Sequence, residues 1–184
     1  AHLEEACFLR AETEILAALV DFSRANPENT YKAAAVIGRD PSPFLHYVII
    51  NRGSNDGILR GMPVVTNQGL VGRVDAVIAD AARVQLITDP ASNVNVRLEN
   101  AETDASLVGS VTGDLELELI PQETNVEAGD LVLTSGLGGG YPEWPRLKAE
   151  VDALGHVLAA VGRAERLENQ SLRAMALKIG ILNR

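Results

Sequence analysis

Apolar and polar residues follow three different patterns along the chain. In residues 1–26, apolar side chains recur at heptad spacing and form one stripe, which Asn26-Pro27 ends. The stripe consists of Phe8, Ile15, Leu19 and Phe22. This spacing predicts an α-helix, and two interpretations stay open because the run is short. The stripe either pairs with another helix as the end of a coiled coil, or packs within its own chain.

From about Tyr31 to Tyr141 the pattern changes to short β-strands. Runs rich in Val, Ile, Leu and Thr are separated by Gly, Asn, Asp and Pro clusters, and no helical pattern lies between them. This spacing favours antiparallel barrels or sandwiches over βαβ units. The run LELELIP alternates strictly, which predicts that Leu115, Leu117 and Leu119 share one face of a half-exposed strand and the glutamates the other.

From about Trp144 the pattern becomes helical again. Apolar residues follow a four-three spacing from Leu147 to Val161, and the spacing resumes from Leu172 to Leu182. Pro145 suits the first turn of a helix. Glycines within the run weaken a helix by roughly 1 kcal/mol each relative to alanine, so this helix needs a packing partner. The sequence therefore predicts a helical segment over residues 144–184.

Composition and charge exclude some classes of function. The chain has 184 residues, of which 46% are hydrophobic and 22% charged, as in ordinary globular proteins. The formal net charge of −9 repels a phosphate backbone and argues against nucleic acid as the main partner. The single cysteine, Cys7, excludes an internal disulfide. No apolar run approaches the length of a transmembrane helix, and we expect any membrane anchor to lie upstream of Ala1.

Two glycine-rich stretches, GMPVVTNQGLVGRV (61–74) and GDLVLTSGLGG (129–139), echo each other. Neither opens a helix in the manner of a dinucleotide fingerprint, and neither contains the G-K-[ST] of a P-loop. We therefore interpret the glycines as corners and tight turns of two similar barrels rather than as a phosphate site. The predicted turn glycines are Gly57, Gly61, Gly69, Gly72, Gly129, Gly136 and Gly138.

No residue pattern predicts catalysis. The three histidines lie far apart and form no metal-binding pair, so neither a metal nor a cofactor is predicted. Asp56, Asp89 and Asp130 occur in turn sequences, which explain them without chemistry. A hydrolase or nucleotide enzyme would need these acids to converge on a polar pocket.

Four long motifs closely resemble the family of the rod shape-determining protein MreC, and they occur in the family's order. They are VIGRDPSPF (36–44), NRGSNDGILRGMPVVTNQGLVGRV (51–74), VQLITDPASNVNVRL (84–98) and GDLVLTSGLGGGYPE (129–143). The resemblance covers about residues 26–143. The helix that ends in ALVDFSRANP also resembles the membrane-proximal coiled coil of that family.

The resemblance implies a non-enzymatic protein of the bacterial inner membrane, with one transmembrane helix, a coiled coil and two β-barrels on the extracytoplasmic (periplasmic) side. It implies self-association, as a homodimer or a higher assembly, and a scaffold function in the peptidoglycan elongation machinery that maintains rod shape. The implied partners are the elongation-specific penicillin-binding transpeptidase and the MreD, RodZ and MreB complex. On this interpretation the membrane is reached through an anchor absent from this chain. The alternative is a small β-barrel module that binds a ligand or peptide.

The predicted fold is mainly β, with two small antiparallel six-stranded barrels between helical ends. The expected division is a helix or coiled-coil end (1–26), part of the first barrel (27–68), the second barrel (69–143) and a helical C-terminal segment (144–184). The family normally continues with strands that close the first barrel. The helical pattern after Glu143 departs from this and leaves three alternatives: a divergent tail, a rearranged chain, or a first barrel that is left open and covered by a helix.

Overall fold

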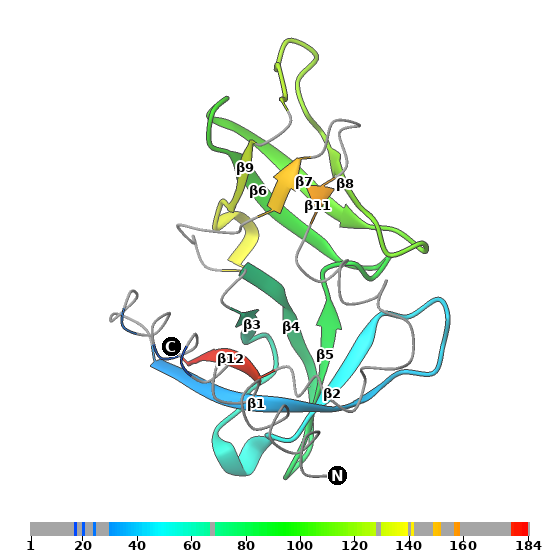
Figure 1. Cartoon of the computed structure of the whole chain (residues 1–184), viewed down its shortest axis with the longest axis vertical. Coiled ribbons are helices and arrows are strands. Elements are labelled where there is room, and N and C mark those ends of the chain that lie inside the picture. Colours follow the sequence, from blue (N-terminus) through cyan, green and yellow to red (C-terminus); the bar gives the residue numbers. More distant parts are fainter. Residues whose placement is uncertain are drawn as a thin grey trace, which may run out of the picture.

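The chain folds mainly into β-structure, as two antiparallel sheets seen in a computed structural model (Figure 1). The structure describes residues 17, 20, 24, 30–66, 69–127, 130–139, 141, 149–151, 157–158 and 178–183. Each sheet contains six strands whose pairing closes into a barrel. In Figure 1 the second barrel lies above the first, and the chain crosses between them after β5.

The first barrel has the strand order β1-β12-β3-β4-β5-β2, and every pairing is antiparallel. Its strands are β1 (Thr30–Arg39), β2 (Tyr47–Ile50), β3 (Pro63–Thr66), β4 (Gly69–Val77), β5 (Ala82–Leu86) and β12 (Lys178–Asn183). A short 3₁₀ turn, η1 (Ser54–Asp56), follows β2. Register shifts in β1 and β4 mark bulges, which bend strands where a small barrel must close.

The second barrel has the strand order β10-β11-β8-β7-β6-β9. Its strands are β6 (Asn93–Leu98), β7 (Thr103–Gly109), β8 (Leu115–Glu118), β9 (Leu131–Thr134), β10 (Ala149–Val151) and β11 (Val157–Leu158). A 3₁₀ turn, η2 (Leu137–Gly139), follows β9. Strand β6 shows why the sheet forms, because Val94, Val96 and Leu98 are buried while the residues between them face solvent.

The two barrels share a packed junction. Val65 of β3 and Leu70 of β4 belong to the first barrel, yet both pack in the buried cluster that fills the second barrel. Ile87, which follows β5, is fully buried in the same cluster, as is Tyr141. A separate cluster of the first barrel includes Ile50, Val64 and Val84.

The predicted helical C-terminal segment is wrong for the part of it that the structure describes. Residues 149–151, 157–158 and 178–183 form β10, β11 and β12. Strand β12 pairs with six residues of β1 and with two of β3, so the first barrel is closed rather than open. Apolar spacing alone is ambiguous in short segments, and the backbone partners offered by β1 and β3 decided the outcome.

The strand pairing also divides the chain differently from the expected ranges. Strands β4 and β5 fall within the predicted second barrel, but they pair with β3 and β2 and so complete the first barrel. The sequence could not show that β4 and β5 belong to the first barrel, because the residues of a strand do not indicate which sheet the strand joins. The change of barrel lies between Leu86 and Asn93.

Leu119 departs from the predicted alternation. Leu115 is buried and Leu117 is half-buried, but β8 ends at Glu118 and the side chain of Leu119 is 82% exposed. Its backbone takes a left-handed conformation, with φ 60, which turns the chain ahead of Pro121.

The predicted N-terminal helix is described only in part. Ala17, Val20 and Arg24 have helical backbone and are exposed. The stripe residues Phe8, Ile15, Leu19 and Phe22 lie outside the described residues. Within the part that is described, no helix reaches the length and hydrophobicity of a membrane span.

Candidate functional site: turn networks and barrel faces

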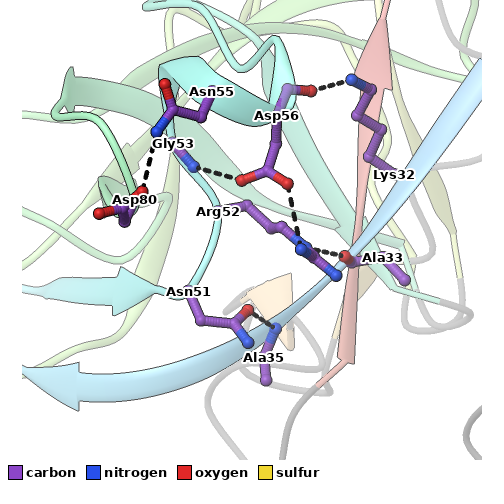
Figure 2. Close-up of polar contacts among 9 residues, drawn as sticks. All are labelled: Lys32, Ala33, Ala35, Asn51, Arg52, Gly53, Asn55, Asp56 and Asp80. Atoms are coloured by element: carbon purple, nitrogen blue, oxygen red, sulfur yellow. Dashed lines mark hydrogen bonds and ion pairs between the residues drawn. The ribbon is translucent and has the colours of Figure 1, made fainter.

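The loop NRGSNDG (51–57) joins three parts of the first barrel (Figure 2). The N–H groups of Ser54 and Asn55 donate to the carbonyl oxygens of Ile78 and Ala79, at 2.9 and 3.0 Å. The amide of Asn55 also donates to Asp80 Oδ1 at 2.9 Å. These bonds attach η1 to the turn between β4 and β5.

Asp56 organises the same loop from within. Its Oδ2 accepts the Gly53 N–H at 3.1 Å, and its Oδ1 accepts a hydrogen bond from Arg52 at 3.0 Å. Arg52 also donates through Nε to the carbonyl oxygen of Ala33 in β1, at 3.2 Å. The Lys32 ammonium donates to the main-chain oxygen of Asp56. Figure 2 shows that the Asp56 side chain points into this network, so the carboxylate holds a turn together.

Asp89 sits at the crossing between the barrels and is fully buried. Its Oδ2 accepts the main-chain N–H of His46 at 2.9 Å, and its Oδ1 accepts from Gln85 Nε2 and from the Ala91 N–H, both at 2.9 Å. The His46 ring donates its Nδ1–H to the Thr88 carbonyl oxygen at 2.8 Å. Both carboxylate oxygens are therefore occupied by the loops that they position.

Asp130 forms a third, separate turn network. Its Oδ2 accepts the Glu127 N–H at 2.9 Å, and its Oδ1 accepts a hydrogen bond from the Asn100 amide. The three acids considered for an enzyme thus lie in three different networks instead of one pocket. Among the described residues, no group of His, Cys, Asp and Glu has the geometry of a metal site.

The predicted turn glycines fall into three groups. Gly57, Gly61, Gly69, Gly136 and Gly138 have positive φ. Gly72 lies within β4, where a Cβ atom would approach the Gln85 carbonyl oxygen to 1.9 Å. Gly129 lies outside the described residues. The two echoing stretches also diverge, because PVVT runs on into β4 while LVLT is followed by η2.

The outer face of the first barrel carries a polar row that the sequence analysis missed. Tyr47 on β2, Gln85 on β5 and Arg73 on β4 occupy paired positions on three adjacent strands. Arg83, two residues before Gln85, lies over the Tyr47 ring at 4.8 Å from its centroid. Burial raises the pKa of the Tyr47 hydroxyl, and the carboxylates of Asp89 and Asp75 add to this rise. The alternation of Arg83 and Gln85 with apolar residues in β5 was the signal that could have indicated this face.

Asp75 pairs with two of the arginines on this face. Its carboxylate forms an ion pair with Arg83 and a longer one with Arg60, at 3.7 Å. Hydrogen bonding to Asp75 raises the pKa of the Arg83 guanidinium. Arg73 is only partly exposed, and it donates no hydrogen bond to any residue in the described part of the chain.

The outer face of the second barrel is acidic along β8. Glu116 and Glu118 are exposed and flank the half-buried Leu117. Neither glutamate forms an ion pair with a described residue. On neighbouring strands Arg97 and Asp104 pair at 2.9 Å, and this hydrogen bond lowers the pKa of Asp104.

Comparison with known proteins agrees with the β-barrel architecture described above. The family model described as "Rod shape-determining protein MreC, barrel core" matches residues 36–144, which begin within β1 and include β2 to β9 of the two barrels. The chain belongs to the MreC family. MreC proteins are non-enzymatic cell-shape proteins, which confirms the predicted family and the prediction that the chain is not an enzyme.

Individual MreC proteins are similar over the same region. The cell shape-determining protein MreC of Escherichia coli is 37% identical over 109 residues, which is 59% of this chain and 30% of that protein. MreC of Haemophilus influenzae is 32% identical over 141 residues, which is 73% of this chain and 39% of that protein. The chain therefore spans less than half the length of these two relatives.

Solved MreC structures share the fold. One MreC structure superposes with a TM-score of 0.76 at 27% identity, covering 96% of this chain and 99% of that one. The major periplasmic domain from the cell shape-determining filament MreC has a TM-score of 0.60 at 21% identity, over 84% and 95% of the two chains. MreC of Helicobacter pylori, solved as a complex with the penicillin-binding protein PBP2, has a TM-score of 0.55 at 16% identity, over 85% and 87%.

Proposed function

We propose that the chain is the extracytoplasmic barrel region of a scaffold for the bacterial cell-elongation machinery, and that it maintains rod shape. It self-associates and binds proteins of peptidoglycan synthesis. The observation that carries the proposal is the family match over residues 36–144, which includes strands β2 to β9 of the two barrels.

The proposed partners are the elongation-specific penicillin-binding transpeptidase and the MreD, RodZ and MreB complex. The Helicobacter pylori relative supports the first of these, because that MreC was solved with PBP2. The proposed location is the periplasmic side of the inner membrane. The periplasmic relative supports this location.

The geometry suggests how such a scaffold binds. Each described sheet closes on itself, so neither offers a free strand edge for a partner strand to extend. The turn networks around Asp56, Asp89 and Asp130 hold the loops in place and leave the outer faces as rigid surfaces. We therefore infer that partners bind to barrel faces rather than by strand addition.

A binding experiment tests the proposal. The immobilised chain is expected to capture the purified periplasmic domain of the elongation-specific transpeptidase from the same cell, with saturable affinity. The periplasmic domain of the division-specific transpeptidase is the matched control. Equal capture of both domains, or of neither, would contradict the transpeptidase assignment. Saturable binding of a glycan or peptide instead would support the alternative of a ligand-binding module.

A further inference from the structure

The two barrels carry outer faces of opposite character. We name as the basic face the residues Arg73, Arg83, Tyr47 and Ile49 on β4, β5 and β2 of the first barrel. We name as the acidic face Glu116, Glu118 and Leu119 at β8 of the second. Both faces retain side chains that lack a partner of opposite charge within the described residues.

Arg73 is the arginine of the basic face that has no hydrogen-bond partner among the described residues. A half-buried guanidinium for which the described residues supply no hydrogen-bond acceptor is costly, because burial weakens its contact with water. The carboxylates that share the surroundings of Tyr47 with Arg73 are already engaged: Asp75 pairs with Arg83, and Asp89 binds the loops at the crossing. Arg73 is therefore placed to take a carboxylate from another molecule.

The acidic face offers two carboxylates at a matching spacing. Glu116 and Glu118 are alternate residues of one strand, which places them about 7 Å apart on the same side. Arg73 pairs with Gln85, and Arg83 lies two residues before Gln85, so the two arginines are diagonal neighbours across β4 and β5. Such neighbours lie about 7–8 Å apart. Two Glu–Arg pairs can therefore form at once, one with Arg73 and one with the exposed guanidinium of Arg83, which keeps its ion pair with Asp75.

Apolar contact continues the same line. Ile49 on β2 lies directly opposite Arg83 on β5 and is 39% exposed. Leu119 follows Glu118 and is 82% exposed. Leu119, the next residue after Glu118, and Ile49, opposite Arg83, therefore offer an apolar contact beside the charged ones.

We propose that the acidic face of one copy docks on the basic face of a second copy, pairing Glu116 and Glu118 with Arg73 and Arg83 and covering Ile49 with Leu119. This rests on the self-association in the proposed function and names its contact. Two chains of net charge −9 repel each other. A glutamate pair is therefore expected to bind most favourably to a face with an unpaired arginine, because the positive charge offsets this repulsion locally. Because the two faces belong to different barrels, the contact is head-to-tail and propagates into a ring or an open filament.

Charge reversal tests the pairing. The variants Arg73→Glu/Arg83→Glu and Glu116→Arg/Glu118→Arg are each expected to associate about tenfold more weakly than the wild-type chain, because like charges then face each other. An equal mixture of the two variants is expected to recover association, since each reversed face meets its reversed partner. Analytical ultracentrifugation measures both effects, and circular dichroism confirms that each variant is folded. The matched control is Glu99→Arg/Glu102→Arg on two exposed residues outside β8, which changes the net charge as much as Glu116→Arg/Glu118→Arg and is expected to leave association unchanged.

A photocrosslinker at position 119 gives an independent measurement, because Leu119 is exposed and its replacement disturbs no core. Crosslinks to the β2 peptide of a second copy support the proposal. Wild-type-like association of both folded variants, or a mixture that stays dissociated, overturns the pairing and leaves self-association standing. A wild-type chain that is monomeric at all concentrations overturns self-association itself, while transpeptidase binding is decided separately by the capture experiment.

Discussion

Gly53 lies so close to the main chain at Ile78 that a Cβ atom on it would approach the Ile78 carbonyl oxygen to 2.2 Å. The same carbonyl oxygen accepts the N–H of Ser54 at 2.9 Å. The glycine therefore lets the NRGSNDG loop contact the β4–β5 turn directly, and the close approach requires a residue without a side chain.

Replacing this glycine is expected to separate the loop from the turn. Gly53→Ala forces the main chain apart, and we expect a loss of about 1–3 kcal/mol of unfolding free energy, as for other overpacked sites. Urea denaturation measures the change. The control is Gly38→Ala in β1, where the nearest atom would lie 3.6 Å from the new Cβ in ordinary contact. Equal stability of the two variants would contradict the account of Gly53.

Asp89 is expected to stabilise the crossing between the barrels through its charge and both oxygens. Asp89→Asn places an amide against an N–H donor, either that of His46 or that of Ala91, and leaves a buried group unsatisfied. We expect a loss of about 1–3 kcal/mol. Thermal or urea unfolding measures it, with Asp80→Asn as the control on an exposed hydrogen bond. A variant as stable as the wild-type chain would show that the buried carboxylate is dispensable.

Strand β12 is expected to close the first barrel. Ile181→Pro removes a main-chain donor within the strand, at a residue paired with Lys32 and Val64. Hydrogen exchange is expected to rise in β1 and β3 and to stay unchanged in β6 and β7. Ile181→Thr keeps the donor and serves as the matched control. Faster exchange in both barrels alike would contradict a closure that is local to the first.

The ion pair between Arg97 and Asp104 predicts a pH dependence. Hydrogen bonding to Arg97 lowers the pKa of Asp104 below its ordinary value of 3.8. A depressed folded-state pKa stabilises the folded state above pH 3.8, and this contribution is lost as the pH falls through the lowered value. NMR titration of the Asp104 carboxyl is expected to show the depressed pKa in the wild-type chain and a return toward 3.8 in Arg97→Gln. A pKa that does not move in the variant would assign the shift to another cause.

Local patterns predicted local structure well. Alternation in LELELIP predicted a strand whose glutamates face solvent, and β8 has Leu115 buried and both glutamates exposed. The turn sequences around Asp56 and Asp130 form turns stabilised by those side chains. Each of these features depends on neighbours within a few residues. The same reasoning failed at Leu119, where a change of one main-chain angle ended the alternation.

The faces of the barrels could not be predicted in this way. Arg73, Gln85 and Tyr47 become neighbours only when β4, β5 and β2 align in one register. A shift of one residue in any strand would turn its side chains to the other side of the sheet. The bulge between Val74 and Ala76 adds a further shift that no local pattern shows.

The sequence by itself determined that the chain is mainly β, that it belongs to the MreC family and that Asp56, Asp89 and Asp130 occupy turns. Strand alternation, turn chemistry and long motifs each depend on residues that are close together in the sequence. Only the tertiary structure decided which strands share a barrel, that β12 returns to close the first one, and which charged side chains meet on a face. These outcomes depend on pairing between segments far apart in the chain, such as β1 with β12. The backbone hydrogen bonds of such pairing can be formed by every residue type except proline, which lacks the donor, so side-chain identity does not specify the partner strand.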